Sequence, residues 1–197
     1  MSLFKDSILI SIMKILLISG SPRDGNSESI LRKIKSLLDE KEIENELLLL
    51  REQNILKCQG CVEFCNHELK CKHNDDTAKL LEKFEQADRY IIATPTYFSM
   101  PPGLLKNFID KLSIHYNRGT DFSGRKGAII TIGSGFKSTG FNAKCLEEFY
   151  RIFKIENVKS LCLKSKSEIP EKDHILTYSE NPDLEKDLQD MLEKITQ

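Results

Sequence analysis

KILLISGSPRDGNS, residues 14–27, joins a short apolar run to a loop of glycine, serine and asparagine. A continuous apolar run ended by Gly20 predicts a strand at residues 14–19 that is buried on both faces. Residues 27–40 then place their apolar side chains at helical spacing. A strand, a loop and a helix in succession form the unit from which parallel sheets are built.

The remainder of the chain continues this alternation. Apolar runs predict four more strands, at residues 46–50, 89–94, 128–132 and 158–163. Helical spacing predicts further helices at residues 75–84, at 103–112, from about 140, and after 182. The pattern predicts an α/β fold in three layers, with one five-stranded parallel sheet between helices on both faces. The length of 197 residues suits a single domain over 1–197.

Composition and charge argue against several classes of function. The formal net charge is −1, so no positive field would gather nucleic acid. The apolar run near the N-terminus is interrupted by Lys14 and is shorter than the roughly 20 residues of a membrane-spanning helix. No small-residue cleavage site follows it, so a signal peptide is not expected. We expect a cytoplasmic protein in which residues 1–12 are a dispensable extension.

The loop after the first strand suits a phosphate group. Gly20 and Gly25 keep the spacing of a nucleoside-triphosphate loop, but Asn26 stands where that loop requires lysine. Backbone N–H groups at a helix N-terminus remain, and they fit one terminal phosphate monoester. The side chains that could contribute are Ser19, Ser21, Asn26 and Ser27, with a charge-assisted bond from Arg23. The alternative is a turn that only caps the helix.

Two more loops leave strands at the same edge of the predicted sheet, where parallel sheets bind their ligands. After the third strand, Tyr97, Phe98 and Met100 offer apolar faces for a flat heteroaromatic ring. The amides around residues 96–99 offer donors for the polar edge of that ring. Tyr97 and Phe98 could equally be surface packing or a subunit contact. After the fourth strand, residues 133–140 form a glycine-rich turn that permits close approach to a ligand.

Four of the six cysteines fall within 14 residues after the second strand. They are Cys58, Cys61, Cys65 and Cys71, in a cysteine-rich loop over residues 51–75. Four thiolates at this spacing on irregular backbone can surround a 4Fe–4S cubane. They could instead bind zinc, although structural zinc sites usually join two close pairs across a longer spacer. The third alternative is that they are free thiols.

The chain resembles the flavodoxin-like NADPH-dependent FMN reductase superfamily, and within it the iron–sulfur flavoproteins of anaerobes. The matching stretches are SGSPRDGNS (19–27), CQGCVEFC…C…DD (58–76) and ATPTYFSMPPGLLKNFIDK (93–111). The resemblance implies FMN, with its phosphate in the loop 19–27. It implies that the flavin ring lies against Thr94, Pro95, Thr96, Tyr97, Phe98 and Ser99, with Gly133, Ser134 and Gly135 nearby. The chain departs from the pattern at one place, where three residues rather than two separate Cys61 from Cys65.

The resemblance further implies an FMN-dependent oxidoreductase, and it supports the first two of three hypotheses for the function, the third being of another class. The first is an electron-transfer flavoprotein whose 4Fe–4S cluster relays electrons from ferredoxin to FMN, in dimers or dimers of dimers. The second is a cluster-free NAD(P)H-dependent reductase of flavins or quinones. The third is a zinc-stabilised binder of a phosphate ligand. No catalytic side chain is required, and His115 and Tyr116 are expected at the surface.

Overall fold

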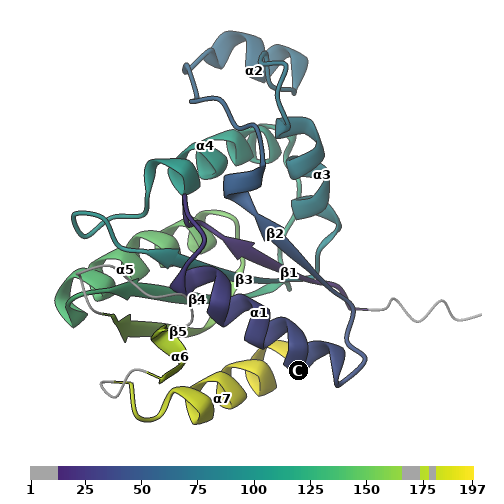
Figure 1. Cartoon of the computed structure of the whole chain (residues 1–197). Coiled ribbons are helices and arrows are strands. Elements are labelled where there is room, and N and C mark those ends of the chain that lie inside the picture. The colour runs from purple at the N-terminus through teal and green to yellow at the C-terminus, as the bar shows by residue number, and fades with distance from the viewer. Residues whose placement is uncertain (1–12, 166–173, 178–180) are drawn as a thin grey trace, which may run out of the picture.

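Five parallel strands form one sheet in the order β2-β1-β3-β4-β5 (Figure 1). The computed structural model describes residues 13–165, 174–177 and 181–197, so the expected extension at residues 1–12 lies outside the described residues. The strands are β1 (Ile15–Ser19), β2 (Asn45–Leu49), β3 (Arg89–Pro95), β4 (Lys126–Gly133) and β5 (Glu156–Lys164). The helices are α1 (Asn26–Asp39), the short η1 (Leu50–Glu52), α2 (Val62–Glu68), α3 (Thr77–Gln86), α4 (Gly103–Arg118), α5 (Phe136–Ile152), α6 (His174–Thr177) and α7 (Leu184–Thr196).

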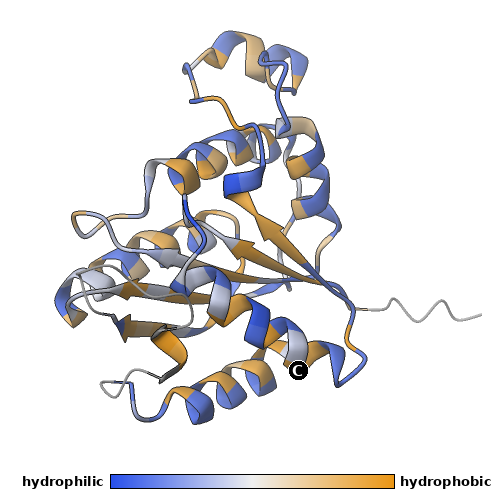
Figure 2. Ribbon diagram, viewed as in Figure 1, coloured by the Kyte–Doolittle hydropathy of each residue, from blue (hydrophilic) through white to orange (hydrophobic). Residues whose placement is uncertain are grey.

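Helices cover both faces of the sheet, with α3, α4 and α5 on one side and α1, α6 and α7 on the other (Figure 1). Leu16 and Ile18 of β1 pack toward the first group, and Ile15 and Leu17 pack toward the second. Apolar residues dominate the strands, whereas the helices alternate apolar and polar residues along their length (Figure 2). Within the described segments, no helix combines the length and the apolar character needed to cross a membrane. The predicted three-layer α/β fold with five parallel strands is confirmed.

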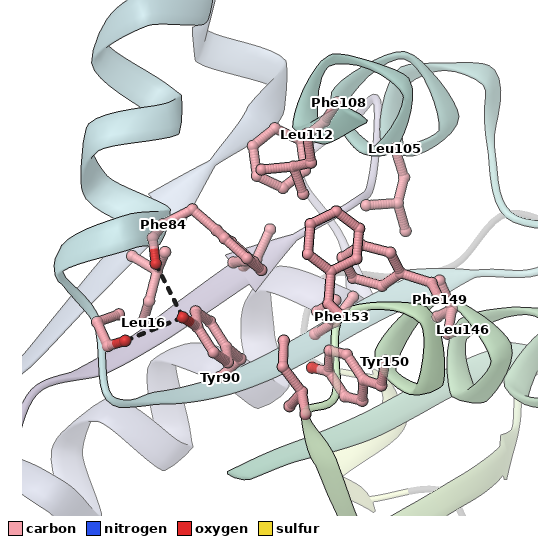
Figure 3. Packing of buried hydrophobic residues seen from close by; sticks show 14 of the residues in the cluster. Leu16, Phe84, Tyr90, Leu105, Phe108, Leu112, Leu146, Phe149, Tyr150 and Phe153 are labelled. Atoms are coloured by element: carbon pink, nitrogen blue, oxygen red, sulfur yellow. Dashed lines mark hydrogen bonds between the residues drawn. The ribbon is translucent and has the colours of Figure 1, made fainter. Parts of the chain in front are cut away.

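An aromatic core lies under α3, α4 and α5 (Figure 3). Tyr90 of β3 is buried and stacks on Phe84 of α3, with the ring centroids 4.3 Å apart. The Tyr90 hydroxyl lies 2.9 Å from the carbonyl oxygens of both Phe84 and Ala87, at the end of α3. Phe84 also contacts Phe108 of α4 edge-on, with centroids 6.1 Å apart. These contacts join α3 to α4, the two helices that support the cysteine-rich loop.

Helix α4 is longer than its apolar stripe predicts, because a buried histidine extends its inner face. The helix runs to Arg118 instead of residue 112. His115 has no exposed surface, so its expected place at the surface is wrong, whereas Tyr116 is exposed as expected. The His115 Nε2 lies 2.9 Å from the carbonyl oxygen of Leu81, and Nδ1 lies 3.3 Å from the hydroxyl of Thr120. A neutral imidazole satisfies both, because it donates at Nε2 and accepts at Nδ1.

Acid is expected to destabilise the fold through His115. Burial lowers the pKa of this imidazole below its ordinary value of 6.5, against the opposite influence of Glu85, whose carboxylate lies 3.8 Å away. Just below pH 6.5 the unfolded chain therefore binds more protons than the folded one, and the free energy of unfolding falls by up to about 1.4 kcal/mol per pH unit. Urea unfolding at neutral and at mildly acidic pH measures this decrease in the free energy of unfolding. The decrease should be smaller in His115→Gln than in the wild type, and an equal decrease in both proteins would contradict the expectation.

Helix α5 begins at Phe136 instead of near residue 140, so most of the predicted glycine-rich turn is helical. The hydroxyls of Ser138 and Thr139 donate to the carbonyl oxygen of Gly135 at 2.8 and 3.2 Å. The amide of Thr139 donates to the same carbonyl oxygen at 3.1 Å, so Gly135 is the residue at which the helix opens. Only residues 134–135 separate β4 from the helix.

Candidate functional site

The carboxyl ends of β1, β3, β4 and β5 surround a small hollow at the rim of the sheet. It is lined by Ser21, Arg23, Gly25, Asn26, Ser27, Pro95, Ile132 and Ser165. Its volume of about 40 Å³ is roughly three times what one buried water needs, which suits a phosphate group and is too small for a flavin ring. The strand order reverses direction between β1 and β3, and sheets of this type bind ligands at such a switch point. Ser165, which follows β5, belongs to the hollow although no sequence motif indicates it.

Helix α1 meets this hollow with its N-terminus, where backbone N–H groups are unused. Gly25 precedes the helix, and its carbonyl oxygen accepts from the amides of Glu28 and Ser29 at 2.9 and 3.0 Å. Within the described part of the chain, the amides of Asn26 and Ser27 donate to no backbone carbonyl. Ser27 is a buried residue that lines the hollow, and its hydroxyl makes no hydrogen bond with another described residue. Free amides at a helix N-terminus attract anions. The residues present therefore fit a phosphate group.

Other side chains of this loop fix its shape. The Ser21 hydroxyl donates to the Arg23 carbonyl oxygen at 2.7 Å and accepts from the Arg23 amide at 3.3 Å. The Asn26 Oδ1 accepts from the N–H of Ile175 in α6 at 3.1 Å, which leaves its Nδ2 hydrogens as the donors it can offer a ligand. Ser19 is buried at the end of β1, and Arg23 is exposed beside the hollow. Ser27 and Asn26 are thus the predicted side chains best placed to donate, and Ser21 holds the loop.

A buried carboxylate lies in the first turn of α1, and no sequence motif indicates its role. Glu28 is 2% exposed. Its Oε1 lies 2.6 Å from the Arg32 guanidinium, and its Oε2 lies 3.0 Å from the guanidinium of Arg51, which η1 supplies. The two guanidinium groups neutralise the carboxylate, so it does not repel an anion at the start of the helix.

The loop after β3 ends in a tight hairpin with a strained backbone. Tyr97 and Met100 exchange backbone hydrogen bonds of 2.9 and 3.0 Å, and Phe98 and Ser99 between them have φ of 49° and 65°. Non-glycine residues rarely adopt this region, and such strain gathers at functional sites. Phe98 is fully exposed at the tip. Because Thr96 and Tyr97 already donate to backbone carbonyls, only the amides of Phe98 and Ser99 remain free for a ring edge among the described residues.

A second hollow, of about 470 Å³, lies beside this hairpin, a volume within the range of small-molecule sites. It is lined by Ser99, Gly135, Lys137, Ser138 and Phe141. Ser134 is exposed and lines neither hollow. Its neighbour Gly133 lies where the loops meet, and a Cβ there would lie 3.1 Å from both Thr96 and Thr139, a tight contact that would press on both side chains.

Asn142 of α5 holds the hairpin loop in place. The side chain is fully buried, and Nδ2 donates to the Pro95 carbonyl oxygen at 3.2 Å and to the Thr96 hydroxyl at 3.0 Å. Its Oδ1 has no partner among the described residues. In the sequence Asn142 is an asparagine next to the apolar stripe of a helix, outside every loop motif.

The cysteine-rich loop projects from the sheet as an arm that carries α2, here called the cysteine arm (residues 54–76; Figure 1). The expectation of irregular backbone is wrong between Cys61 and Cys65, because Val62–Glu68 is helical and Cys61 directly precedes it. Residues four apart lie on one face of a helix, and the two Sγ atoms are 3.7 Å apart. The three-residue gap is thus one helical turn, which brings the two sulfurs together.

The other three thiols of the cysteine arm influence Cys65. Burial raises the pKa of the Cys65 thiol to about 11, and Cys61, Cys71 and Cys58 act in the same direction. Two sulfurs bound to one tetrahedral metal at about 2.3 Å lie about 3.8 Å apart, close to the separation of Cys61 and Cys65. In the described segments, however, no three or more His, Cys, Asp or Glu side chains are grouped to hold a metal ion. The donor chemistry fits a thiolate-bound centre, although the four sulfurs are not arranged around one point.

Asp75 closes the base of the cysteine arm. Its carboxylate has no exposed surface and accepts from the amides of Leu56 and Thr77, both at 3.0 Å, and from Lys111 Nζ at 3.2 Å. Burial would raise the pKa of Asp75, but these hydrogen bonds outweigh burial and hold the pKa below its ordinary value. Helix α3 therefore starts at Thr77, two residues after the predicted start, because Asp75 joins both ends of the arm.

Residues 13–166 match the family model described as NADPH-dependent FMN reductase. An iron–sulfur flavoprotein of Archaeoglobus fulgidus is 37% identical over 99 residues, which are 50% of this chain and 48% of that protein. This chain thus spans about half of that relative. An iron–sulfur flavoprotein of Methanocaldococcus jannaschii is 29% identical over 74% of both chains. An NAD(P)H-dependent FAD/FMN reductase of Geobacillus thermodenitrificans is 33% identical over 51% of this chain and 52% of its own.

Solved structures share the fold. An apo NADH:FMN oxidoreductase superposes with a TM-score of 0.68 at 16% identity, over 93% of this chain and 89% of its own. A mutant flavodoxin from Pseudomonas aeruginosa superposes with a TM-score of 0.57 at 17% identity, over 94% of this chain and all of its own. At this identity the superpositions establish the flavodoxin-like architecture alone.

Proposed function

The chain belongs to the NADPH-dependent FMN reductase family, and from this premise we propose that it is an FMN-dependent oxidoreductase with a 4Fe–4S cluster in its cysteine arm. The observation that carries the proposal is the rim hollow, where the unused amides of Asn26 and Ser27 meet the Ser27 hydroxyl. Such a site binds one phosphate monoester without magnesium. The neutralised Glu28 supports this assignment.

The proposed flavin site extends from this hollow along the rim. The 5′-phosphate lies in the small hollow, and the ring lies toward the hairpin and the 470 Å³ hollow. The complete set of proposed FMN residues is Ser19, Ser21, Arg23, Asn26, Ser27, Thr94, Pro95, Thr96, Tyr97, Phe98, Ser99, Gly133, Ser134 and Gly135. The free amides of Phe98 and Ser99 donate to the polar edge of the ring, and the buried Asn142 keeps their loop in place.

We assign the cluster ligands to Cys58, Cys61, Cys65 and Cys71. Bound there, a cubane exchanges single electrons, whereas FMN takes one or two, so the pair can connect one-electron donors to two-electron acceptors. The chain itself supplies four thiols on one short arm, which Asp75 closes at its base. Ferredoxin or NAD(P)H is the proposed donor, and the exposed Phe98 hairpin is compatible with a dimer or a dimer of dimers in the cytoplasm.

A cluster-free NAD(P)H-dependent reductase is the second candidate. Two observations favour it: the described residues contain no ready-made group of metal ligands, and a relative named as a reductase is 33% identical over half of the chain. A zinc-stabilised phosphate binder is the third, because the Cys61–Cys65 separation suits two thiolates on one tetrahedral zinc ion.

Metal and flavin analysis of anaerobically purified protein tests the proposal. We expect a flavin spectrum together with iron and acid-labile sulfide in about equal amounts, as in a cubane. Flavin without metal would replace the proposal by the cluster-free reductase. A colourless protein that contains zinc would support the third candidate and contradict both flavin-dependent ones.

A further inference from the structure

Lys111 is a buried lysine whose ammonium contacts a sulfur of the cysteine arm. It lies on α4 and is 4% exposed, and it is the one buried lysine among the described residues. Its Nζ lies 3.1 Å from the Sγ of Cys71 and 3.2 Å from the Asp75 carboxylate. A buried ammonium is costly unless it is paired, so these two acceptors determine where it lies.

We propose that Lys111 is a positioning residue that donates a charge-assisted hydrogen bond to the Cys71 thiolate and thereby raises the reduction potential of the cluster. The inference rests on the proposed function, because it requires a cluster held by Cys71. Reduction adds negative charge to a thiolate-bound cluster. A nearby cation and a hydrogen bond to a ligand sulfur stabilise the reduced state more than the oxidised state, and the potential rises.

The other lysines of the cysteine arm cannot replace this contact. Lys57, Lys70 and Lys72 are exposed, so water and salt screen their charges. Asp75 offsets part of the Lys111 charge, but the carboxylate already accepts from two backbone amides. The ammonium hydrogen directed at Cys71 therefore provides the specific interaction with the centre.

The test compares three substitutions of Lys111 by anaerobic redox titration, with iron content measured on the same samples. Lys111→Met removes the charge and the donor, Lys111→Gln keeps a neutral donor, and Lys111→Arg keeps both. Lys106→Met is the matched control, because Lys106 lies on the same helix, is exposed and pairs with Asp110.

We expect Lys111→Met to lower the equilibrium constant for one-electron reduction of the cluster about tenfold, which corresponds to about 59 mV. Lys111→Arg and Lys106→Met should stay near the wild type. If Lys111→Met loses its iron, the Lys111→Gln and Lys111→Arg variants decide the test. A reduction potential that is lower than the wild type in Lys111→Gln but not in Lys111→Arg supports the inference. Equal potentials in all iron-containing variants, or loss of iron from all three, would overturn it. Absence of iron from the wild type would refute the proposed cluster itself.

Discussion

Asp75→Ala is expected to release most of the iron and to leave the flavin bound. The buried carboxylate joins the backbone at Leu56 to Thr77 and pairs with Lys111. Its removal leaves a buried ammonium without its carboxylate partner, which costs about 3–5 kcal/mol in comparable sites. The destabilisation is confined to the cysteine arm, because none of these three hydrogen bonds joins Asp75 to the rim of the sheet. The flavin should therefore stay bound.

Iron, sulfide and flavin counts after gel filtration measure this effect. Asp110→Ala is the matched control, since the half-buried Asp110 pairs with the exposed Lys106 of the same helix and not with Lys111, and it should keep its iron. Cys65→Ala should lose iron as Asp75→Ala does and also keep its flavin. Wild-type iron in Asp75→Ala would show that the carboxylate does not hold the cysteine arm together.

Ser27→Asp is expected to weaken FMN binding by roughly 100-fold or more, because a carboxylate beside the phosphate costs several kcal/mol. Ser27 is buried in the first turn of α1, with a hydroxyl that has no other partner among the described residues. An acidic side chain is favoured in the first turn of a helix, so the fold should survive the substitution. The carboxylate would occupy the place of the phosphate.

Titration of the apoprotein with FMN, followed by flavin fluorescence, measures this loss. Ser27→Ala removes one hydrogen bond and should weaken binding about tenfold. Ser36→Asp adds the same charge on the exposed face of the same helix and should bind like the wild type. Wild-type affinity in Ser27→Asp would place the phosphate elsewhere.

The strands could be predicted from sequence because buried parallel strands are continuous apolar runs. β1, β3 and β4 lie within two residues of their predicted ends for this reason. Helix ends were less predictable, because they depend on polar groups that an apolar stripe does not reveal. His115 extends α4 through a bond to the carbonyl oxygen of Leu81 in α3, and the hydroxyls of Ser138 and Thr139 bond to the Gly135 carbonyl oxygen at the start of α5.

The loops of the candidate site could be predicted because each is a contiguous motif at the end of a strand. The side chains that hold these loops in place could not be predicted, because they come from distant parts of the chain. Asn142 reaches Thr96 from α5, and Arg51 reaches Glu28 from η1. Lys111 lay within a quoted family stretch, yet only the fold shows that it contacts Cys71.

We propose that the rim of the sheet binds FMN by its phosphate. The most direct measurement is a calorimetric comparison of FMN and riboflavin binding to the wild-type apoprotein, since the two differ only in that phosphate. We predict one FMN per chain, bound about 100-fold or more tightly than riboflavin, as expected for a charged group with several hydrogen bonds. Equal affinities, or no binding of either flavin, would contradict the account.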